Sequence, residues 1–397
     1  SASATGVGSS APLPTIEHSR LLKGDFLRRQ LRSLRSKYFD KNIQKDVEEC
    51  MKNGDTKGVT ALRNRKIKPA VMAVERWFMH YALRYPASDP ENAERDVVFP
   101  MFANMTTYDE SVDPQTQIEL VKDLCTAKDL YDDAVLIAND LLKISHNLAL
   151  ELRAERMDAL ASATSMNADT AGVVTLVRHK HTLDIMLSPT GASHTPTAST
   201  STAKKGAKGG NSSSSSVTPP LTAEPIPGTG AIGTGKRAKG RELLKLNPSH
   251  LDKLRAQYER ASGRSLDTPE DEQEFLNRVF CLLARYQTIQ GHGFQAAVAE
   301  LAFGVLHKDL GVDLEVFASP LNSTFAYHCS AYPDTDSVFG SIGSFFDMKP
   351  VSGSYECNPP FVLKVMSSMV EHISHLLHNA TGPMSFVVVV PRWEEAE

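Results

Sequence analysis

The residues best suited to chemistry are four consecutive ones, Asn358-Pro359-Pro360-Phe361, here called the NPPF motif. The side-chain oxygen of Asn358 and the carbonyl oxygen of Pro359 can each accept one hydrogen of the N6 amine of adenine. This grip aims the nitrogen lone pair at an electrophile and stabilises the positive charge that develops on nitrogen. Proline fixes its own φ, so the carbonyl is held in place in advance, and Phe361 offers a ring on which a base can stack. The motif therefore suits methyl transfer from S-adenosylmethionine to adenine N6.

The neighbours of the NPPF motif favour this interpretation. A strand-like run at 353–357 precedes the motif, and an apolar helical pattern at 362–378 follows it. The motif is thus expected at the carboxyl end of a strand, which is where open α/β sheets bind ligands. The alternative is a Pro-Pro turn between strand and helix, with Phe361 packed into the core as a plug.

The elements around the motif predict an α/β domain. Strands are expected at 313–318, 325–330 and 387–390, and the four valines of the last run are typical of a strand buried on both faces. Helices are expected at 275–286, 295–307 and 362–378. Because a helix lies between two strand candidates, we expect a parallel sheet with right-handed β-α-β crossovers.

The rest of the chain divides by composition. Residues 1–18 are small and polar and are predicted to form a disordered tail, and residues 19–187 form a mostly helical domain, with one helix opened by Pro69 and spanning 70–81. Residues 188–240 are rich in Ser, Thr, Gly, Pro and Lys with almost no large apolar residue, which predicts a disordered insertion. Residues 241–397 then form the domain that carries the NPPF motif.

Composition and charge exclude several classes of protein. With Lys+Arg 43 and Asp+Glu 47, a surface that binds nucleic acid must be a local patch. The five scattered cysteines contain no Cys-x-x-Cys pair, which argues against a disulfide framework and a zinc ribbon, so no metal is expected. No apolar run has the length of a membrane span and no signal peptide is evident, so we expect a soluble intracellular protein. Since the chain starts at Ser1 and stops after a strand-like run, a fragment is expected.

A longer stretch resembles one known family. Four runs of sequence carry the resemblance and lead into the NPPF motif in the same order and spacing. They are FASPLN at 317–322, CSAYPDTD at 329–336, FGS at 339–341 and GSYEC at 353–357. The chain thereby resembles the phosphorylated-CTD-interacting factor family over about 275–393, and more weakly from Phe26 onward.

The resemblance implies a fold, an activity and partners. That family comprises cap-specific methyltransferases, which methylate N6 of the 2′-O-methylated adenosine beside the messenger RNA cap, with S-adenosylmethionine as cofactor. It implies a Rossmann-like class I methyltransferase domain, here C-terminally incomplete, preceded by a helical domain that binds the cap. Capped messenger RNA is the implied partner, the nucleus the implied location, and the phosphorylated polymerase tail would bind through a module outside this chain.

The resemblance also implies cofactor-binding residues. The chain has no Gly-x-Gly-x-x-Gly loop, and the residues that fill its place are Ala318, Ser319, Pro320 and Asn322. Small side chains let the backbone approach a ligand, and Asn322 can hydrogen-bond the methionine moiety or the ribose. Asp334 or Asp336 is the candidate acid for the ribose diol, although an Asp after a proline is also common in turns. Asn358 is expected to border the cofactor as well as the substrate.

Substrate-binding residues are implied in both domains. Trp393 matches a family position where it could stack on the base or the cap, or else shield the sheet edge. The candidates for cap phosphates are arginines, because their forked donors match phosphate oxygens; a solvated basic face is the alternative. They are Arg28, Arg29, Arg63 and Arg65.

Three departures from the family pattern keep other functions open. Leu363 and Lys364 stand where the family carries an acidic pair, the family's WW module is not visible, and the chain ends near Trp393. One alternative is an N6-adenine methyltransferase that acts on other RNA or on DNA. Another is a non-catalytic module of the same fold that binds RNA or the transcription machinery.

Overall fold

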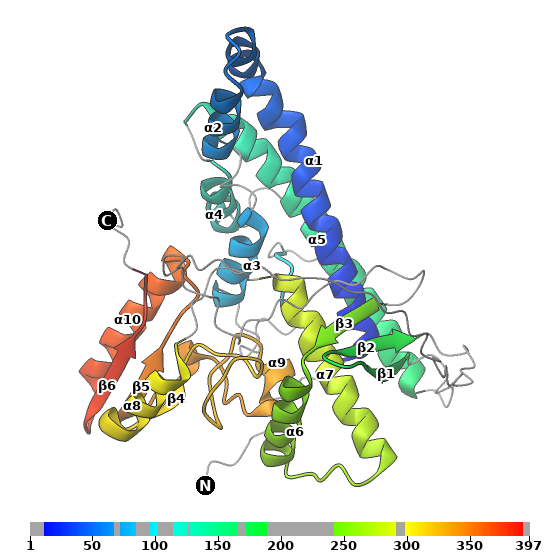
Figure 1. Cartoon of the computed structure of the whole chain (residues 1–397), viewed down its shortest axis with the longest axis vertical. Coiled ribbons are helices and arrows are strands. Elements are labelled where there is room, and N and C mark those ends of the chain that lie inside the picture. Colours follow the sequence, from blue (N-terminus) through cyan, green and yellow to red (C-terminus); the bar gives the residue numbers. More distant parts are fainter. Residues whose placement is uncertain are drawn as a thin grey trace, which may run out of the picture.

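The structure is a computed structural model, and it describes residues 12–66, 72–84, 95–101, 114–125, 128–164, 172–188, 242–290 and 298–391. Within these ranges, long helices on one side lead down to an antiparallel and a parallel sheet (Figure 1). None of the described helices is long and apolar enough to span a bilayer.

The helical part is built around α1 (Pro14–Lys52), which packs against α5 (Tyr131–Thr164) along much of its length (Figure 1). Leucines at helical spacing, such as Leu27 and Leu31, are buried in a shared core with Trp77 and Phe78, as expected for an amphipathic helix. The remaining helices of this part are α2 (Thr56–Lys66), α3 (Ala73–Arg84), α4 (Pro114–Leu124) and the 3-10 helix η3 (Lys128–Leu130).

An antiparallel sheet of order β1-β2-β3 lies beside the lower end of α1. Its strands are β1 (Val173–Arg178), β2 (Leu183–Ser188) and β3 (Glu242–Leu246), and Leu187 of β2 pairs with Glu242 of β3. Their apolar side chains form a second core with α6 (Pro248–Ser262) and α7 (Pro269–Ile289). Since α7 also packs against α1, it joins the helical part to the sheets.

The parallel sheet has the order β4-β5-β6, with β4 (Val312–Glu315), β5 (Gly353–Cys357) and β6 (Met384–Val388). β5 pairs in parallel with both neighbours, so the three carboxyl ends meet at one edge. α8 (Glu300–Leu310) leads into β4, and α10 (Leu363–Asn379) connects β5 to β6. The β4–β5 connection holds the short helices α9 (Pro333–Asp336), η5 (Ser337–Phe339) and η6 (Phe345–Asp347).

The mixed α/β class and the parallel sheet are confirmed, with corrections to individual elements. Helices were correctly predicted at 275–286 and 362–378, within α7 and at α10, and the one expected at 295–307 is α8. The helix expected at 70–81 is α3, and Pro69 lies outside the described residues. No strand forms at 325–330, where His328 makes isolated bridges, and the strand expected at 313–318 is β4, which ends at Glu315.

Two further expectations about strands were wrong. β1 and β2 lie within the stretch predicted to be mostly helical, where Val173-Val174-Thr175 already shows the β-branched composition of a strand. The valines at 387–390 are not buried on both faces, because among the described residues β6 is an edge strand paired only with β5. Val388 and Val390 keep 42% and 48% of their surface exposed.

Candidate active site at the carboxyl edge of the parallel sheet

The two predicted ligand-binding segments follow neighbouring strands. β4 ends at Glu315 and leads into residues 318–325, called the 318–325 turn, while β5 ends at Cys357 and leads into the NPPF motif. Beyond β4 the two segments stay joined, because the Val316 amide donates to the Glu356 carbonyl at 2.9 Å. The fold thus places the predicted cofactor residues and the predicted catalytic residues on adjacent strand ends, where α/β sheets bind ligands.

The NPPF motif forms a tight passage from strand to helix. Asn358 is 8% exposed and Pro359 is buried, whereas Pro360 and Phe361 are half-buried. The Val362 amide donates to the Pro360 carbonyl at 2.7 Å, and α10 begins one residue later. Because the Phe361 ring keeps exposed surface and is absent from the described cores, it is not a fully buried core plug.

The 318–325 turn is closed by its own polar groups. Oδ1 of Asn322 accepts hydrogen bonds from the Ser319 amide at 2.7 Å and from the Ser319 hydroxyl at 2.8 Å. The Asn322 amide donates in return to the Ser319 carbonyl at 3.1 Å. Ser319 and Pro320 are buried and Ala318 is half-buried. The Asn322 oxygen predicted to meet a ligand therefore shapes the turn.

A row of polar side chains crosses the sheet at this edge. Glu315 is in register with Glu356 on one side and bridges to His328 on the other, so the three side chains point to the same face. All three are buried, with exposed fractions of 4%, 1% and 0%. Among the described residues, Glu356 Oε1 and both ring nitrogens of His328 have no hydrogen-bond partner. Buried polar atoms in this state are ones that a water or a polar ligand would satisfy.

Burial controls the protonation of this row. It raises the pKa of Glu356 to about 8, with a further contribution from the nearby Glu315. It also raises the pKa of Glu315, against which two backbone amides and Lys253 act. Burial and then Lys253 lower the pKa of His328 to about 4. At neutral pH the row therefore holds a neutral His328 and a largely protonated Glu356, since two adjacent buried carboxyls do not both ionise readily.

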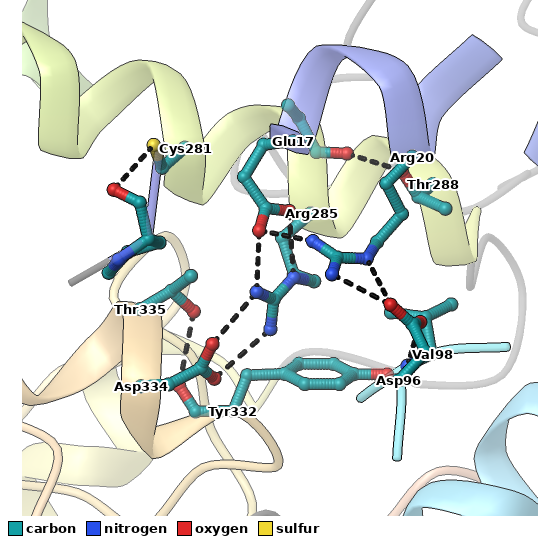
Figure 2. A network of polar contacts seen from close by, with 12 residues as sticks. Glu17, Arg20, Asp96, Val98, Cys281, Arg285, Thr288, Tyr332, Asp334 and Thr335 are labelled. Carbon is teal, nitrogen blue, oxygen red and sulfur yellow. Dashed lines mark hydrogen bonds and ion pairs between the residues drawn. The ribbon is translucent and has the colours of Figure 1, made fainter. Parts of the chain in front are cut away.

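Asp334, predicted to bind the ribose, is instead tied to the helical part of the fold (Figure 2). Arg285 of α7 donates to both of its carboxylate oxygens, at 3.0 and 2.8 Å. The same guanidinium donates to Glu17 of α1, at 2.9 and 2.7 Å. The alternative acid, Asp336, is fully buried and accepts a hydrogen bond from Tyr286 at 2.6 Å. Both acids therefore contribute to the packing of α9, and ribose binding by Asp334 stays a prediction.

Comparison with known proteins addresses the same part of the chain. Residues 253–397 match the family described as phosphorylated CTD interacting factor 1 WW domain. The mRNA (2'-O-methyladenosine-N(6)-)-methyltransferase of Mus musculus is 43% identical to this chain over 165 residues, and that of Homo sapiens is 42% identical over 165 residues. Each match covers 40% of this chain and 23% of the relative.

This part of the chain is therefore similar in sequence to the phosphorylated CTD interacting factor family. Since the alignments span 23% of the curated relatives, the family-matched part is a limited region of those proteins. It contains two thirds of α6, all of α7 and the whole parallel sheet with both candidate ligand-binding segments.

The arginines predicted to bind cap phosphates lie before the family-matched part, and the structure separates them. Arg28 is 7% exposed, and its Nε donates to Glu75 at 2.8 Å while its Nη2 donates to the Thr288 carbonyl. It therefore connects α1 to α3 and α7, a structural role in place of the predicted one. Arg29 is exposed, with its guanidinium 5.9 Å from the ring centre of Phe26. The side chains of Arg63 and Arg65, and all of Trp393, lie outside the described residues.

The sequence analysis did not predict the buried charged residues near the carboxyl edge of the parallel sheet. Glu315 and Glu356 lie among the buried residues at the ends of β4 and β5, and Arg285 interrupts the apolar face of α7. A charged residue within an apolar element is rarely buried without a partner, so this interruption was a readable signal. The partners of Arg285 and Glu356 could not be predicted, because Glu17 and Glu315 lie far from them along the chain.

Proposed function

We propose that this chain is an S-adenosylmethionine-dependent methyltransferase of Rossmann type that methylates N6 of the cap-adjacent 2′-O-methyladenosine of messenger RNA. The observation that carries the proposal is the position of the NPPF motif on the strand end next to the 318–325 turn. The activity for which the mouse and human relatives are named supports the same reaction. A nuclear location, which the family resemblance implies, is part of the proposal.

The NPPF motif would hold the reacting amine. The Asn358 side-chain oxygen and the Pro359 carbonyl accept the two N6 hydrogens, which directs the lone pair away from the ring plane. Positive charge then develops on nitrogen beside two oxygen dipoles that are already in place. Because the methylated ammonium is acidic, its proton leaves without a strong base. The half-buried Phe361 ring supplies a face on which the adenine can stack.

The residues at this edge fit S-adenosylmethionine. Bound there, the cofactor supplies a methyl group on a positively charged sulfur. Ala318 and Ser319 have small side chains, so the backbone of the turn can approach a ligand closely. The orphan Oε1 of Glu356 and the orphan ring nitrogens of His328 offer buried polar atoms for ribose or base groups. We place the cofactor against Ala318, Ser319, Pro320 and Asn358.

The helical part would carry the substrate to this edge. α3 packs against α10, the helix that follows the NPPF motif. Burial lowers the pKa of His80 on α3, and Lys364 in the first turn of α10 is close enough to contribute to that shift. The domain division at 19–187, 188–240 and 241–397 remains part of the proposal. So do cap contacts by Arg29, Arg63, Arg65 and Trp393, and binding of the phosphorylated polymerase tail through a module outside this chain.

A methyl-transfer assay tests the proposal directly. The substrate is capped RNA that begins with 2′-O-methyladenosine, and the product is N6-methylated adenosine detected by mass spectrometry. Replacing Asn358 with Ala should lower the turnover by about 10²–10³-fold, the usual effect of removing one preorganised polar group. Asn379→Ala is the matched control, because Asn379 is exposed at the far end of α10. Equal loss in both variants would contradict the assigned role.

The same assay separates the two alternatives. Equal methylation of uncapped RNA or DNA, without competition from a cap analogue, would favour a broader N6-adenine methyltransferase. A non-catalytic module is favoured by one observation, the exposed Lys364 directly after the motif, where the resembled family is acidic. Calorimetry with S-adenosylhomocysteine decides this point, because a binding module without turnover needs no affinity for the cofactor product.

A further inference from the structure

The buried carboxylate of Glu315 fixes one end of the 318–325 turn. Glu315 Oε1 accepts hydrogen bonds from the backbone amides of Thr324, at 2.5 Å, and of Phe325, at 2.9 Å. A carboxylate that receives two amide hydrogens binds them more strongly than a neutral oxygen would. The far end of the turn is therefore fixed to the end of β4 by one ionised side chain.

Helix α6 also contacts the 318–325 turn. Gln257 Nε2 donates to the Ser323 hydroxyl at 2.9 Å, and both side chains are buried. Lys253 lies four residues earlier, on the same face of α6, and is half-buried. Gln257 and Lys253 thus share the face of α6 that contacts the turn, and the charge of Lys253 acts on both Glu315 and His328.

The groups around Glu315 show what the Lys253 charge does to the protonation of Glu315. Glu315 faces Glu356 from β5 and His328 from the bridge, and from α6 it faces Lys253. Burial lowers the pKa of His250 on α6, and the charge of Lys253 lowers it further. Lys253 is thus the only positively charged group among those named, since burial keeps both histidines neutral at pH 7. An ionised Glu315 lies buried beside a second carboxyl, and the Lys253 charge adds to the stabilisation that the Phe325 and Thr324 amides already give it.

We propose that Lys253 and Glu315 are positioning residues: the Lys253 ammonium keeps Glu315 ionised, and Glu315 in turn holds the 318–325 turn in its ligand-binding shape. The assignment to ligand binding rests on the proposed function. The role of Glu315 in fixing the 318–325 turn does not rest on the proposed function, because it follows from the hydrogen bonds of Glu315 alone. Burial lowers the pKa of Lys253 to about 8 while Glu315 acts against this shift, so the ammonium is present at pH 7.

Amide hydrogen exchange tests the hold without any ligand. Protection factors of Thr324 and Phe325 are measured from pH 5 to pH 8, since they correct for the intrinsic pH dependence of exchange. In the unmodified chain the protection should fall as pH drops through the Glu315 pKa. Lys253→Met removes the opposing charge, raises that pKa, and should move the midpoint up by about one pH unit. Lys253→Arg should restore the original midpoint.

The control and the binding measurement separate this inference from the proposed function. Lys308→Met removes the same charge from an exposed position on α8 and should leave the midpoint unchanged. S-adenosylhomocysteine affinity at pH 7 should fall about tenfold in Lys253→Met and recover in Lys253→Arg. An unshifted midpoint in a folded Lys253→Met chain overturns the inference. A shifted midpoint in a chain that never binds S-adenosylhomocysteine supports the hold on the turn and refutes the proposed function.

Discussion

Arg285 is the residue whose loss should destabilise the chain most visibly. It is 1% exposed and makes four charge-assisted hydrogen bonds, two to Glu17 of α1 and two to Asp334 of α9 (Figure 2). We consider Arg285→Met, which keeps a long apolar side chain and removes the charge. Glu17 retains Arg20 as a partner, whereas Asp334 loses both of its donors from Arg285.

Two independent estimates give the size of the effect. Removing one partner of a buried ion pair costs about 3–5 kcal/mol, because the other charge remains buried. Burial raises the pKa of Glu17, but Arg20 and Arg285 outweigh it and lower that pKa from 4.5 to about 2. A shift of that size corresponds to about 3 kcal/mol shared between the two arginines, so Arg285 accounts for part of it, and the loss of both Arg285 donors to Asp334 adds the rest of the expected cost. We therefore expect Arg285→Met to lower the free energy of unfolding by about 3 kcal/mol.

Urea unfolding followed by circular dichroism measures this loss, and its pH dependence adds a second check. A carboxyl with a lowered folded-state pKa stabilises the fold above its unfolded pKa, and that stability disappears as the pH falls. For Glu17 the window runs from about pH 4.5 down to about pH 2. Arg285→Met should flatten the stability profile across this window, because one of the two cations that lower the Glu17 pKa is gone.

Arg255→Met is the matched control. Arg255 also makes two hydrogen bonds to one carboxylate, Glu272, both at 2.6 Å, but the two side chains are 30% and 34% exposed. Solvent-exposed pairs of this kind contribute only about 0–1 kcal/mol. If Arg285→Met costs no more than Arg255→Met, the buried network does not stabilise the fold and the reasoning is refuted.

Three smaller changes test other parts of the fold. Gly340→Ala should lower the free energy of unfolding in urea by about 1–3 kcal/mol, since Gly340 has φ +102 and an added Cβ would lie 2.5 Å from the Ala326 carbonyl oxygen. Gly304→Ala in α8, where nothing lies within 4 Å of an added Cβ, should raise it by about 0.5–1 kcal/mol. Equal effects of the two substitutions would contradict this reasoning. Burial raises the pKa of Asp336 to about 7, so the free energy of unfolding should fall as the pH rises from about 4 to 7. Asp336→Asn should remove that pH dependence, and an unchanged dependence would exclude Asp336 as its source. Thr268→Ala removes the side chain that caps α7 and should cost about 0.5–2 kcal/mol by thermal unfolding, whereas no loss would show that the cap is dispensable.

The local parts of the site could be predicted from the sequence. The NPPF motif lies between a strand and a helix because two prolines end a strand and α10 follows with strong apolar periodicity. A turn follows β4 as expected, since Ala318, Ser319, Pro320 and Asn322 are small, polar or proline. Both predictions depended on neighbours within about twenty residues, where composition and periodicity carry the information.

The long-range contacts could not be predicted in the same way. Asp334 after a proline has the same local sequence whether it binds a ribose or an arginine, and only the fold brings Arg285 to it. Arg28 likewise lies in a helix rich in basic residues, most of them exposed, and its burial depends on Glu75 and Thr288. The four valines at 387–390 suggested a central strand because hydrophobicity does not reveal which strands lie beside β6.

The pairing of β2 with β3 has a consequence for the variation that the chain can tolerate. Leu187 and Glu242 are opposite each other in an antiparallel ladder, so the segment between them leaves and re-enters the sheet at one place. Where two paired residues hold the ends of a connection together, the entropy of closing that connection grows only with the logarithm of its length, about 0.6 kcal/mol for each doubling. Insertions and deletions between 189 and 241 should therefore accumulate in evolution almost without penalty, while a single residue lost from either strand would flip the register that anchors both ends.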